Sequence, residues 1–279
     1  MSAATYKLWS KGKQMILDEF SLFKERQKKS WGSFTPLEIL FTMPAAQLVS
    51  FAQVKSSDAV LDVGCGTGVV ALTAARLGAK VAAIDLCPEL LDHARQNRVK
   101  AGVDISLMEG DVEALPYDNN AFDVVLSQFG HIFAPRPNIA ISEMLRVLKP
   151  GGTIAFSTWP PDLFVGRLFQ LVTKYVPPPP FASLPPLWGM PHFVRAQLSD
   201  HVDNLIFEQG NMIVPALSVG HYRESAEMSH SSIKKLIQES KNNPDVLRTF
   251  RKEFEELISE YFENNHLSLH YLMSRARKN

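Results

Sequence analysis

Residues 59–158 alternate short apolar runs with segments whose apolar residues recur at the helical period. Ala59–Val63 is such a run, a glycine-rich turn follows it, and Val69–Leu77 then has helical spacing before a second run at Val81–Ile84. This order predicts a βαβ unit, in which a helix joins two parallel strands. It restricts the possible folds more than any other feature of the chain.

The alternation continues to the end of this segment. The pattern predicts, in order, a helix, two strands, a helix and a strand at Glu89–Ala101, Ile105–Glu109, Phe122–Ser127, Ile139–Leu148 and Thr153–Thr158. Five short strands interleaved with helices favour a parallel sheet that is covered on both faces. We therefore expect an α/β, doubly wound, Rossmann-like fold with helical additions.

The chain changes character beyond this segment, because the prolines between residues 177 and 191 interrupt regular elements. We interpret residues 160–200 as an insertion that binds substrate rather than as part of the sheet. Asn204–Val214 then alternates like a strand, residues 219–264 have the pattern of charged helices, and Leu267–Ser274 alternates as a last strand. The charged helices are interpreted as a solvated face with a core stripe; walling a substrate cleft and pairing two subunits are the alternatives.

Residues 1–53 are expected to form an N-terminal helical cap on a domain that comprises residues 54–279. The apolar residues that share one helical face in this cap are Leu8, Met15, Ile16, Phe20 and Phe23. Between Ser30 and Pro44, aromatic residues and prolines predict an irregular cover. Such a cap could simply pack on the sheet or could gate a ligand site by moving.

Charge and composition limit the function classes. Lysine plus arginine and aspartate plus glutamate each number 29, so the formal net charge is zero and no nucleic-acid partner is expected. The two cysteines, Cys65 and Cys87, do not make a disulfide framework. With neither a signal-peptide pattern nor an apolar run long enough to span a membrane, the protein is expected to be cytoplasmic, as a monomer or homodimer.

The turn after the first run, Asp62–Gly68, predicts a ligand site. Its glycines lie between a strand and a helix, where the backbone turns tightly and a ligand can approach closely. A dinucleotide-binding turn places its third glycine one residue later, but residue 69 is Val, and the Asp62 carboxylate would repel a phosphate. A ligand that carries an ammonium and a sulfonium would be attracted instead.

Two further carboxylates follow the next two strands. Asp85 ends the second strand, where it suits the two hydroxyls of a ribose. Asp111 follows the third strand, where it can accept from an adenine amino group while the N–H of Val112 donates to the ring. The alternatives are a structural turn without a ligand and carboxylates that cap loops.

Three segments in this order carry a resemblance: Val60–Gly68 (VLDVGCGTG), Gly110–Pro116 (GDVEALP) and Arg146–Gly152 (RVLKPGG). They are similar to the ordered motifs of class I S-adenosylmethionine-dependent methyltransferases, over about residues 55–160. The most similar branch, methyltransferase type 11, includes the ubiquinone and menaquinone biosynthesis C-methyltransferases. The resemblance implies a seven-stranded sheet, mostly parallel, whose last strand is antiparallel.

The resemblance also implies roles for individual residues in binding S-adenosylmethionine as cofactor. It implies that Gly64, Gly66 and Gly68 hold the methionine moiety, that Asp85 holds the ribose, that Asp111 and Val112 hold the adenine, and that Ser127 and Gln128 border the methyl group. Asp62 and Leu86 are predicted to belong to the same cofactor site. No metal is implied, and no His, Cys and Asp spacing in the sequence indicates one.

Catalytic and substrate-binding residues are harder to predict. His131 leaves the fourth strand facing the expected crevice, so it is a candidate general base, although it could instead hydrogen-bond the backbone of its own loop. Trp159, Trp188 and His192 are candidates for the pocket of the methyl acceptor, with closure of an apolar lid as the alternative.

The expected function is methylation of a small molecule at oxygen, carbon or nitrogen. The alternatives are an RNA or protein methyltransferase and a non-catalytic protein that binds S-adenosylmethionine. A dehydrogenase is disfavoured by Asp62 and Val69, which do not suit a pyrophosphate.

Overall fold

The computed structural model describes residues 19–279, apart from the side chains of residues 33–37 and of Ser199. Within this range eight strands form one sheet in the order β3-β2-β1-β4-β5-β8-β6, with the short β7 paired to β8. The strands are β1 (Ala59–Val63), β2 (Lys80–Asp85), β3 (Ile105–Glu109), β4 (Phe122–Gln128), β5 (Leu148–Thr158), β6 (Val202–Pro215), β7 (Phe262–Glu263) and β8 (His266–Lys278).

Strand directions follow the expectation. β1 pairs in parallel with β2 and β4, β2 with β3, and β4 with β5, whereas β8 runs antiparallel to β5 and β6. The sheet thus reverses its strand order between β1 and β4, which is where open α/β sheets form a ligand crevice. The doubly wound, Rossmann-like fold with an antiparallel last strand is confirmed.

Among the strands, β5 departs most from its predicted start. β5 starts at Leu148 rather than Thr153, because Leu148 already pairs with Phe122 before the register shifts. Gly151, with φ of 72°, supplies the backbone conformation that side chains rarely adopt at this irregular point.

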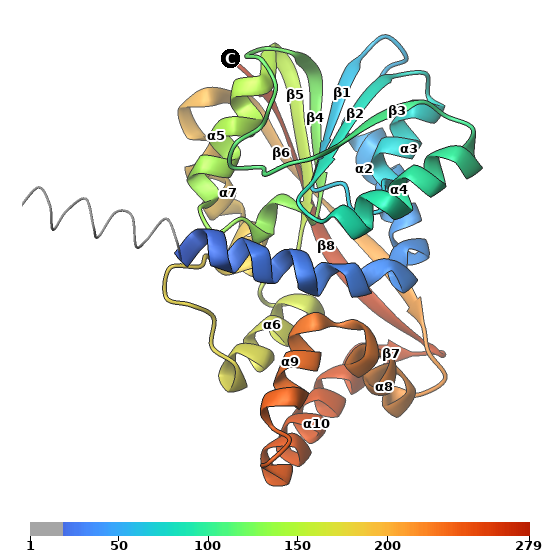
Figure 1. Ribbon diagram of the computed structural model, residues 1–279, viewed down its shortest axis with the longest axis vertical. Helices are drawn as coiled ribbons and strands as arrows, with labels where there is room; N and C mark the ends of the chain where they lie inside the picture. The colour runs from blue at the N-terminus through green and yellow to red at the C-terminus, as the bar shows by residue number, and fades with distance from the viewer. Residues whose placement is uncertain (1–18) are drawn as a thin grey trace, which may run out of the picture.

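Helices cover both faces of the sheet (Figure 1). On one side lie α2 (Thr42–Phe51), α3 (Val69–Arg76) and α4 (Pro88–Ala101), and on the other lie α5 (Pro137–Val147) and α7 (Pro191–Leu198). Short 3-10 segments are η1 (Gly32–Phe41), η2 (His131–Phe133), η3 (Pro185–Gly189) and η4 (Ser199–His201). Proline occupies the first turn of α4 and α5, where its fixed φ suits a helix start.

The N-terminal part that the structure describes begins as a helix over residues 19–31, and this helix crosses the edge of the sheet (Figure 1). The segment between Ser30 and Pro44 forms no strand, as expected, but it is helical rather than irregular: η1 follows the helix, and α2 begins at Thr42. Pro44 lies in the first turn of α2, where the missing N–H costs no helical hydrogen bond. Leu8, Met15 and Ile16 lie outside the described residues.

A group of helices lies beyond the same edge: α6 (Phe164–Tyr175), α8 (Val219–Ser229), α9 (Ser231–Glu239) and α10 (Pro244–Ser259) (Figure 1). The long strands β6 and β8 reach down to them. The predicted helices within residues 219–264 are therefore confirmed. Residues 160–200 contain no strand, as expected, although their longest helix, α6, was not predicted.

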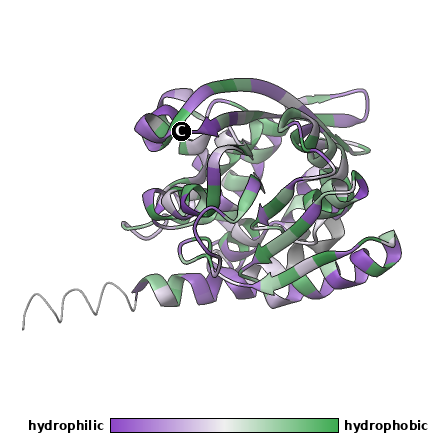
Figure 2. Cartoon of the chain, turned by 90° about the horizontal axis from the view of Figure 1, so that it is seen from above, coloured by the Kyte–Doolittle hydropathy of each residue, from purple (hydrophilic) through white to green (hydrophobic). Residues whose placement is uncertain are grey.

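The core follows the sheet. Most residues of the central strands β1 and β4 are buried, and the surrounding helices carry hydrophobic and hydrophilic residues side by side (Figure 2). The side chains of Leu61, Leu126 and Phe156 in the middle strands are fully buried, as are Phe164 and Phe254 among the lower helices. No helix among the described residues is long and apolar enough to cross a membrane.

Candidate active site

A cavity of about 460 Å³ opens at the carboxyl ends of β1 to β4. Strand register aligns these ends, since Val63 pairs with Ile84 and Asp85 with Glu109. We call the part of the cavity at these strand ends the sheet end; the residues that line it include Asp62, Gly64, Cys65, Gly66, Asp85, Leu86, Asp111, Val112 and Gln128. The other part, the helical end, is lined by residues of α6, β6 and α8, and Trp159 stands at the end of β5 beside it.

The three glycines of the turn have different surroundings. A Cβ on Gly64 would lie 2.8 Å from Cα of Gly130, so the loop after β4 packs directly on this glycine. Gly68, with φ of 86°, is the N-cap of α3 and packs against Ala94 rather than lining the cavity. Gly66 has φ of 54° and no atom within 4 Å of its would-be Cβ. Of the three, Gly66 is therefore the one that leaves open space for a ligand.

Two carboxylates, the buried Asp62 and the half-buried Asp85, face the sheet end. Asp62 accepts a hydrogen bond from the N–H of Ala71 at 3.0 Å through Oδ2, while its Oδ1 has no partner among the described residues. Burial raises the pKa of Asp62 to about 7, and the negative charge of Asp85 adds to the effect. Asp85 accepts from the N–H groups of Gly66 at 2.7 Å and Cys87 at 2.8 Å, and burial raises its pKa.

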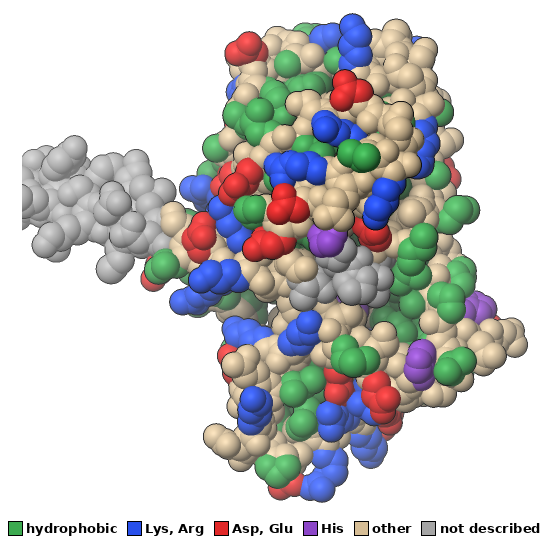
Figure 3. All heavy atoms as spheres, turned by 45° about the vertical axis from the view of Figure 1, so that its right-hand side comes forward, with side chains coloured by type: hydrophobic (Ala, Val, Ile, Leu, Met, Phe, Trp, Pro, Cys, Tyr) green, Lys and Arg blue, Asp and Glu red, His purple; other side chains and the backbone are tan. Residues whose placement is uncertain are grey.

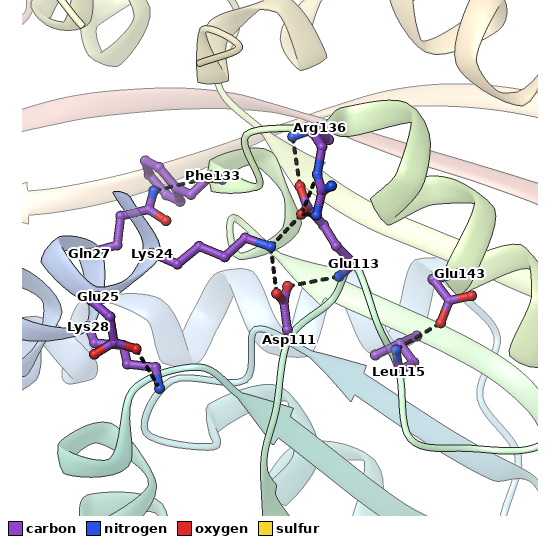
Figure 4. A network of polar contacts seen from close by, with 10 residues as sticks. All are labelled: Lys24, Glu25, Gln27, Lys28, Asp111, Glu113, Leu115, Phe133, Arg136 and Glu143. Atoms are coloured by element: carbon purple, nitrogen blue, oxygen red, sulfur yellow. Dashed lines mark hydrogen bonds and ion pairs between the residues drawn. The ribbon is translucent and has the colours of Figure 1, made fainter. Parts of the chain in front are cut away.

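Asp111 belongs to a network of charges at the edge of this site (Figure 4). Its Oδ1 accepts from the N–H of Glu113 at 2.9 Å, and its Oδ2 pairs with Nζ of Lys24 at 2.5 Å. Lys24 also contacts Glu113, which Arg136 holds from the other side through Nε at 2.9 Å and Nη2 at 2.6 Å. The Glu113 side chain is 1% exposed, so Lys24 and Arg136 compensate the cost of burying its negative charge.

The sequence did not indicate Lys24, Glu113 and Arg136 as parts of one network. Lys24 lies on the helix of residues 19–31, which also donates from Gln27 to the carbonyl of Phe133 at 3.0 Å. Glu113 stands inside the matched GDVEALP segment, which was the one available signal. The contacts place this helix across the sheet end of the cavity (Figure 4).

Of the adjacent residues Ser127 and Gln128, only Gln128 lines the cavity. The Ser127 hydroxyl donates to the carbonyl of Val63 at 2.7 Å and accepts from the N–H of His131 at 3.0 Å. It is fully buried and does not line the cavity, so it joins β4 to β1 rather than bordering a methyl group. Gln128 does line the cavity; its amide donates to Phe41, and its Oε1 is buried with no partner in the described part of the chain.

His131 lies in the cavity wall, but its ring packs into the aromatic core. The ring centroids of Phe156 and Trp188 lie 4.6 and 4.7 Å away, and neither ring nitrogen has a partner among residues 19–279. Burial lowers the pKa of His131 to about 3. A base of such low pKa is a poor proton acceptor near neutral pH, so the structure does not support the predicted catalytic role.

Replacing His131 with phenylalanine is expected to leave stability near neutral pH unchanged or raised, because two buried nitrogens without partners are removed. The unfolded histidine titrates at 6.5 and the folded one at about 3, so the unfolded state binds more protons in between. The wild type should therefore lose about 1 kcal/mol per pH unit more than the variant as pH falls through this window. Urea unfolding at several pH values measures this difference; parallel pH profiles would contradict it.

The three residues predicted for the acceptor pocket differ in their position relative to the cavity. Trp159 lines the cavity and stacks on Phe129, with ring centroids 4.0 Å apart. Trp188 is fully buried beside His131 and does not line the cavity, because η3 packs its ring into the core. His192 is exposed at the start of α7, away from the cavity lining. The predictions for Trp188 and His192 are thus corrected, whereas Trp159 stays a candidate.

The described residues do not support metal or thiol chemistry at this site. Within residues 19–279, no group of three or more His, Cys, Asp or Glu side chains is placed to hold a metal ion. Cys65 and Cys87 are both free, and burial raises the pKa of each thiol. A raised pKa keeps a thiol protonated and unreactive.

The chain is similar in sequence to a known domain family and to individual proteins. The methyltransferase domain family matches residues 61–156. An uncharacterised protein of Mycobacterium tuberculosis is 33% identical over 233 residues, which are 83% of this chain and 85% of the relative. The ubiquinone biosynthesis O-methyltransferase of Xanthomonas axonopodis pv. citri is 35% identical over 161 residues, which are 57% of this chain and 66% of that enzyme.

A solved structure shares the fold. The YcgJ protein of Bacillus subtilis superimposes with a TM-score of 0.60 at 17% identity, covering 84% of this chain and 97% of that one. The residues that the family model matches run from within β1 to within β5 and include the glycine turn, Asp85 and Asp111. On the family match, the sequence relatives and this fold, the chain belongs to the class I S-adenosylmethionine-dependent methyltransferases.

Proposed function

We propose that this enzyme transfers the methyl group of S-adenosylmethionine to a small molecule that binds at the helical end of the cavity. The observation that carries the proposal is the continuity of the cavity, which runs from the glycine turn past Trp159 to α6 and α8. Its volume of about 460 Å³ lies in the range of small-molecule sites. A polymer would need an open groove instead.

The sheet end fits S-adenosylmethionine. Asp62 Oδ1 and Gln128 Oε1 are buried acceptors without partners in the described chain, and such atoms suit the ammonium of a methionine moiety. Gly66 leaves the space that a closely bound ligand needs. Asp85 is the candidate for the ribose and Asp111 with Val112 for the adenine, since all three line this end.

The sulfonium supplies a methyl group that is already activated, so the protein contributes alignment of donor and acceptor and exclusion of water. The helix of residues 19–31 lies over the sheet end through Lys24 and Gln27 and thereby shields it. We propose that residues 1–53 act as this cap on a catalytic domain of residues 54–279.

Two further observations support a small acceptor. The Xanthomonas relative is named for ubiquinone biosynthesis, in which the methylated compound is a small molecule. On the face shown in Figure 3, Lys and Arg side chains interleave with Asp and Glu and form no stripe of one sign. An RNA-binding surface is expected to be basic.

Methyl transfer from tritium-labelled S-adenosylmethionine into a fractionated cell extract tests the proposal. We expect the wild type to add label to the small-molecule fraction beyond that of the extract alone, and Asp85→Ala protein to add much less. Label that follows RNA or protein instead would overturn the small-molecule assignment. An enzyme that binds S-adenosylmethionine but labels no fraction would favour a non-catalytic binding protein.

Replacing Gly66 with alanine is expected to weaken S-adenosylhomocysteine binding about tenfold or more, because the new methyl group enters the open space at the turn. Gly102→Ala is the matched control: Gly102 has φ of 63° and equally open surroundings, but it ends α4 away from the cavity. Calorimetric titration of both variants, with thermal unfolding alongside, separates lost affinity from backbone strain. Equal affinities in the two variants would argue against a ligand at Gly66.

A further inference from the structure

One face of α8 forms a wall of the helical end. The residues concerned are Tyr222, Ser225, Ala226, Ser229 and His230, which follow the spacing i, i+3, i+4, i+7 and i+8 and all line the cavity. A helix face at this spacing is normally apolar where it is buried. This face instead carries four polar side chains.

A neighbouring face of α8, which carries Arg223 and Glu227, is fixed to α10 by ion pairs. Arg223 pairs with Glu227 at 2.7 Å and with Glu255 at 2.6 Å, and Arg251 pairs with Glu227 at 2.7 Å. These bonds set the rotation of α8 about its axis. The polar face is therefore directed to the cavity by the fold.

Two groups on this face have no hydrogen-bond partner in the described chain: the hydroxyl of Tyr222 and the imidazole of His230. Tyr222 is 7% exposed, and its ring packs edge-on against Phe164 and Phe254, with centroids 5.7 and 6.4 Å away. His230 caps the end of α8, where its backbone N–H donates to the carbonyl of Ala226 at 2.9 Å. Tyr222 is buried and His230 half-buried, and both line the cavity, so each side chain can hydrogen-bond a ligand there.

Both groups are neutral near neutral pH. Burial raises the pKa of Tyr222 and lowers the pKa of His230 to about 4. Among the described residues, no Asp, Glu, Lys or Arg lines the helical end. His221, Ser231 and Ser232 are further polar residues in its lining, and the other walls are largely apolar, with Phe164, Phe169 and Met212 among them. All charged residues that line the cavity lie at the sheet end.

We propose that Tyr222 and His230 form the binding site for the polar group of the acceptor, which is an uncharged, mainly apolar ring compound bearing a hydroxyl. A phenol hydroxyl and a neutral imidazole can each donate and accept, which matches a group that also does both. An anion or a cation would be desolvated in this chamber without a countercharge. This assignment rests on the proposed function, because it takes the helical end to be where the acceptor binds.

The test uses four probes with the same ring system: naphthol, naphthalene, naphthoate and naphthylmethylamine. Their affinities are measured by calorimetry on the full chain saturated with S-adenosylhomocysteine. We expect naphthol to bind most tightly. Tyr222→Phe and His230→Phe should each weaken naphthol roughly fivefold to tenfold, the worth of one hydrogen bond, and leave naphthalene and S-adenosylhomocysteine unchanged.

Tyr261→Phe and His270→Phe are the matched controls, since neither residue lines the cavity. Naphthol affinity in these two variants should equal that of the wild type. The inference is overturned if naphthoate or naphthylmethylamine binds as tightly as naphthol, or if neither cavity variant changes naphthol affinity. Failure of S-adenosylhomocysteine to bind the wild type would instead refute the proposed function, so the two failures are distinguishable.

Discussion

Replacing Asp85 with alanine is expected to weaken S-adenosylhomocysteine binding about hundredfold, since a carboxylate that accepts from two ribose hydroxyls makes two charge-assisted hydrogen bonds. The loss includes an indirect part. Asp85 also accepts from the N–H groups of Gly66 and Cys87, so its removal loosens the glycine turn itself. Calorimetric titration of the variant gives the combined effect.

Asp123→Ala is a suitable control for this change. Asp123 lies near the start of β4. Like Asp85 it accepts from a backbone N–H, that of Ala59 at 2.9 Å, and it also accepts from Lys149 at 2.7 Å, but it lies outside the cavity. We expect Asp123→Ala to lower the unfolding temperature without lowering affinity. Asp85→Asn should bind with intermediate strength, because it keeps one acceptor oxygen. Unchanged affinity in Asp85→Ala would show that the ribose is bound elsewhere.

Replacing Arg136 with methionine is expected to lower the free energy of unfolding by about 3 kcal/mol, because Glu113 would remain buried with Lys24 as its remaining cation. Nε and Nη2 of Arg136 both donate to Oε2 of Glu113, and the backbone N–H of Arg136 donates to Oε1 at 2.7 Å, so the carboxylate is held closely. Denaturant unfolding measures the change.

Arg95→Met provides the comparison, since the pair of Arg95 with Asp92 is exposed and is expected to be worth less than about 1 kcal/mol. Equal losses of unfolding free energy in the two variants would mean that burial of Glu113 does not increase the contribution of its ion pair to stability. Affinity for S-adenosylhomocysteine in Arg136→Met reports how far the network positions Asp111.

Much of the fold was predictable because strands and helices differ in period. β1 and β3 have the predicted bounds, since each is a short run closed by a turn, and α4 was predicted to within one residue at its start. The sheet end was predictable for a related reason: residues that directly follow parallel strands must meet at one edge. Asp62, Asp85 and Asp111 lie there.

The predictions failed for residues whose surroundings are set by segments distant in the sequence. Ser127 and Trp188 were predicted to face a ligand. Instead, Ser127 makes hydrogen bonds to the backbone, and Trp188 is enclosed in an aromatic core. The pairing of Lys24 with Asp111 joins positions 87 residues apart, which no local pattern encodes. The polar face of α8 carries the helical period, but the period alone does not say which element or cavity a face meets.

A crystal structure of the protein with S-adenosylhomocysteine tests the central claim, that one cavity joins a donor site to an acceptor site. We predict the ribose hydroxyls on Asp85, the adenine beside Asp111 and Val112, and the sulfur directed past Trp159 to the helical end. A complex in which the ligand fills the helical end, or in which the sulfur points away from Trp159, would contradict the account.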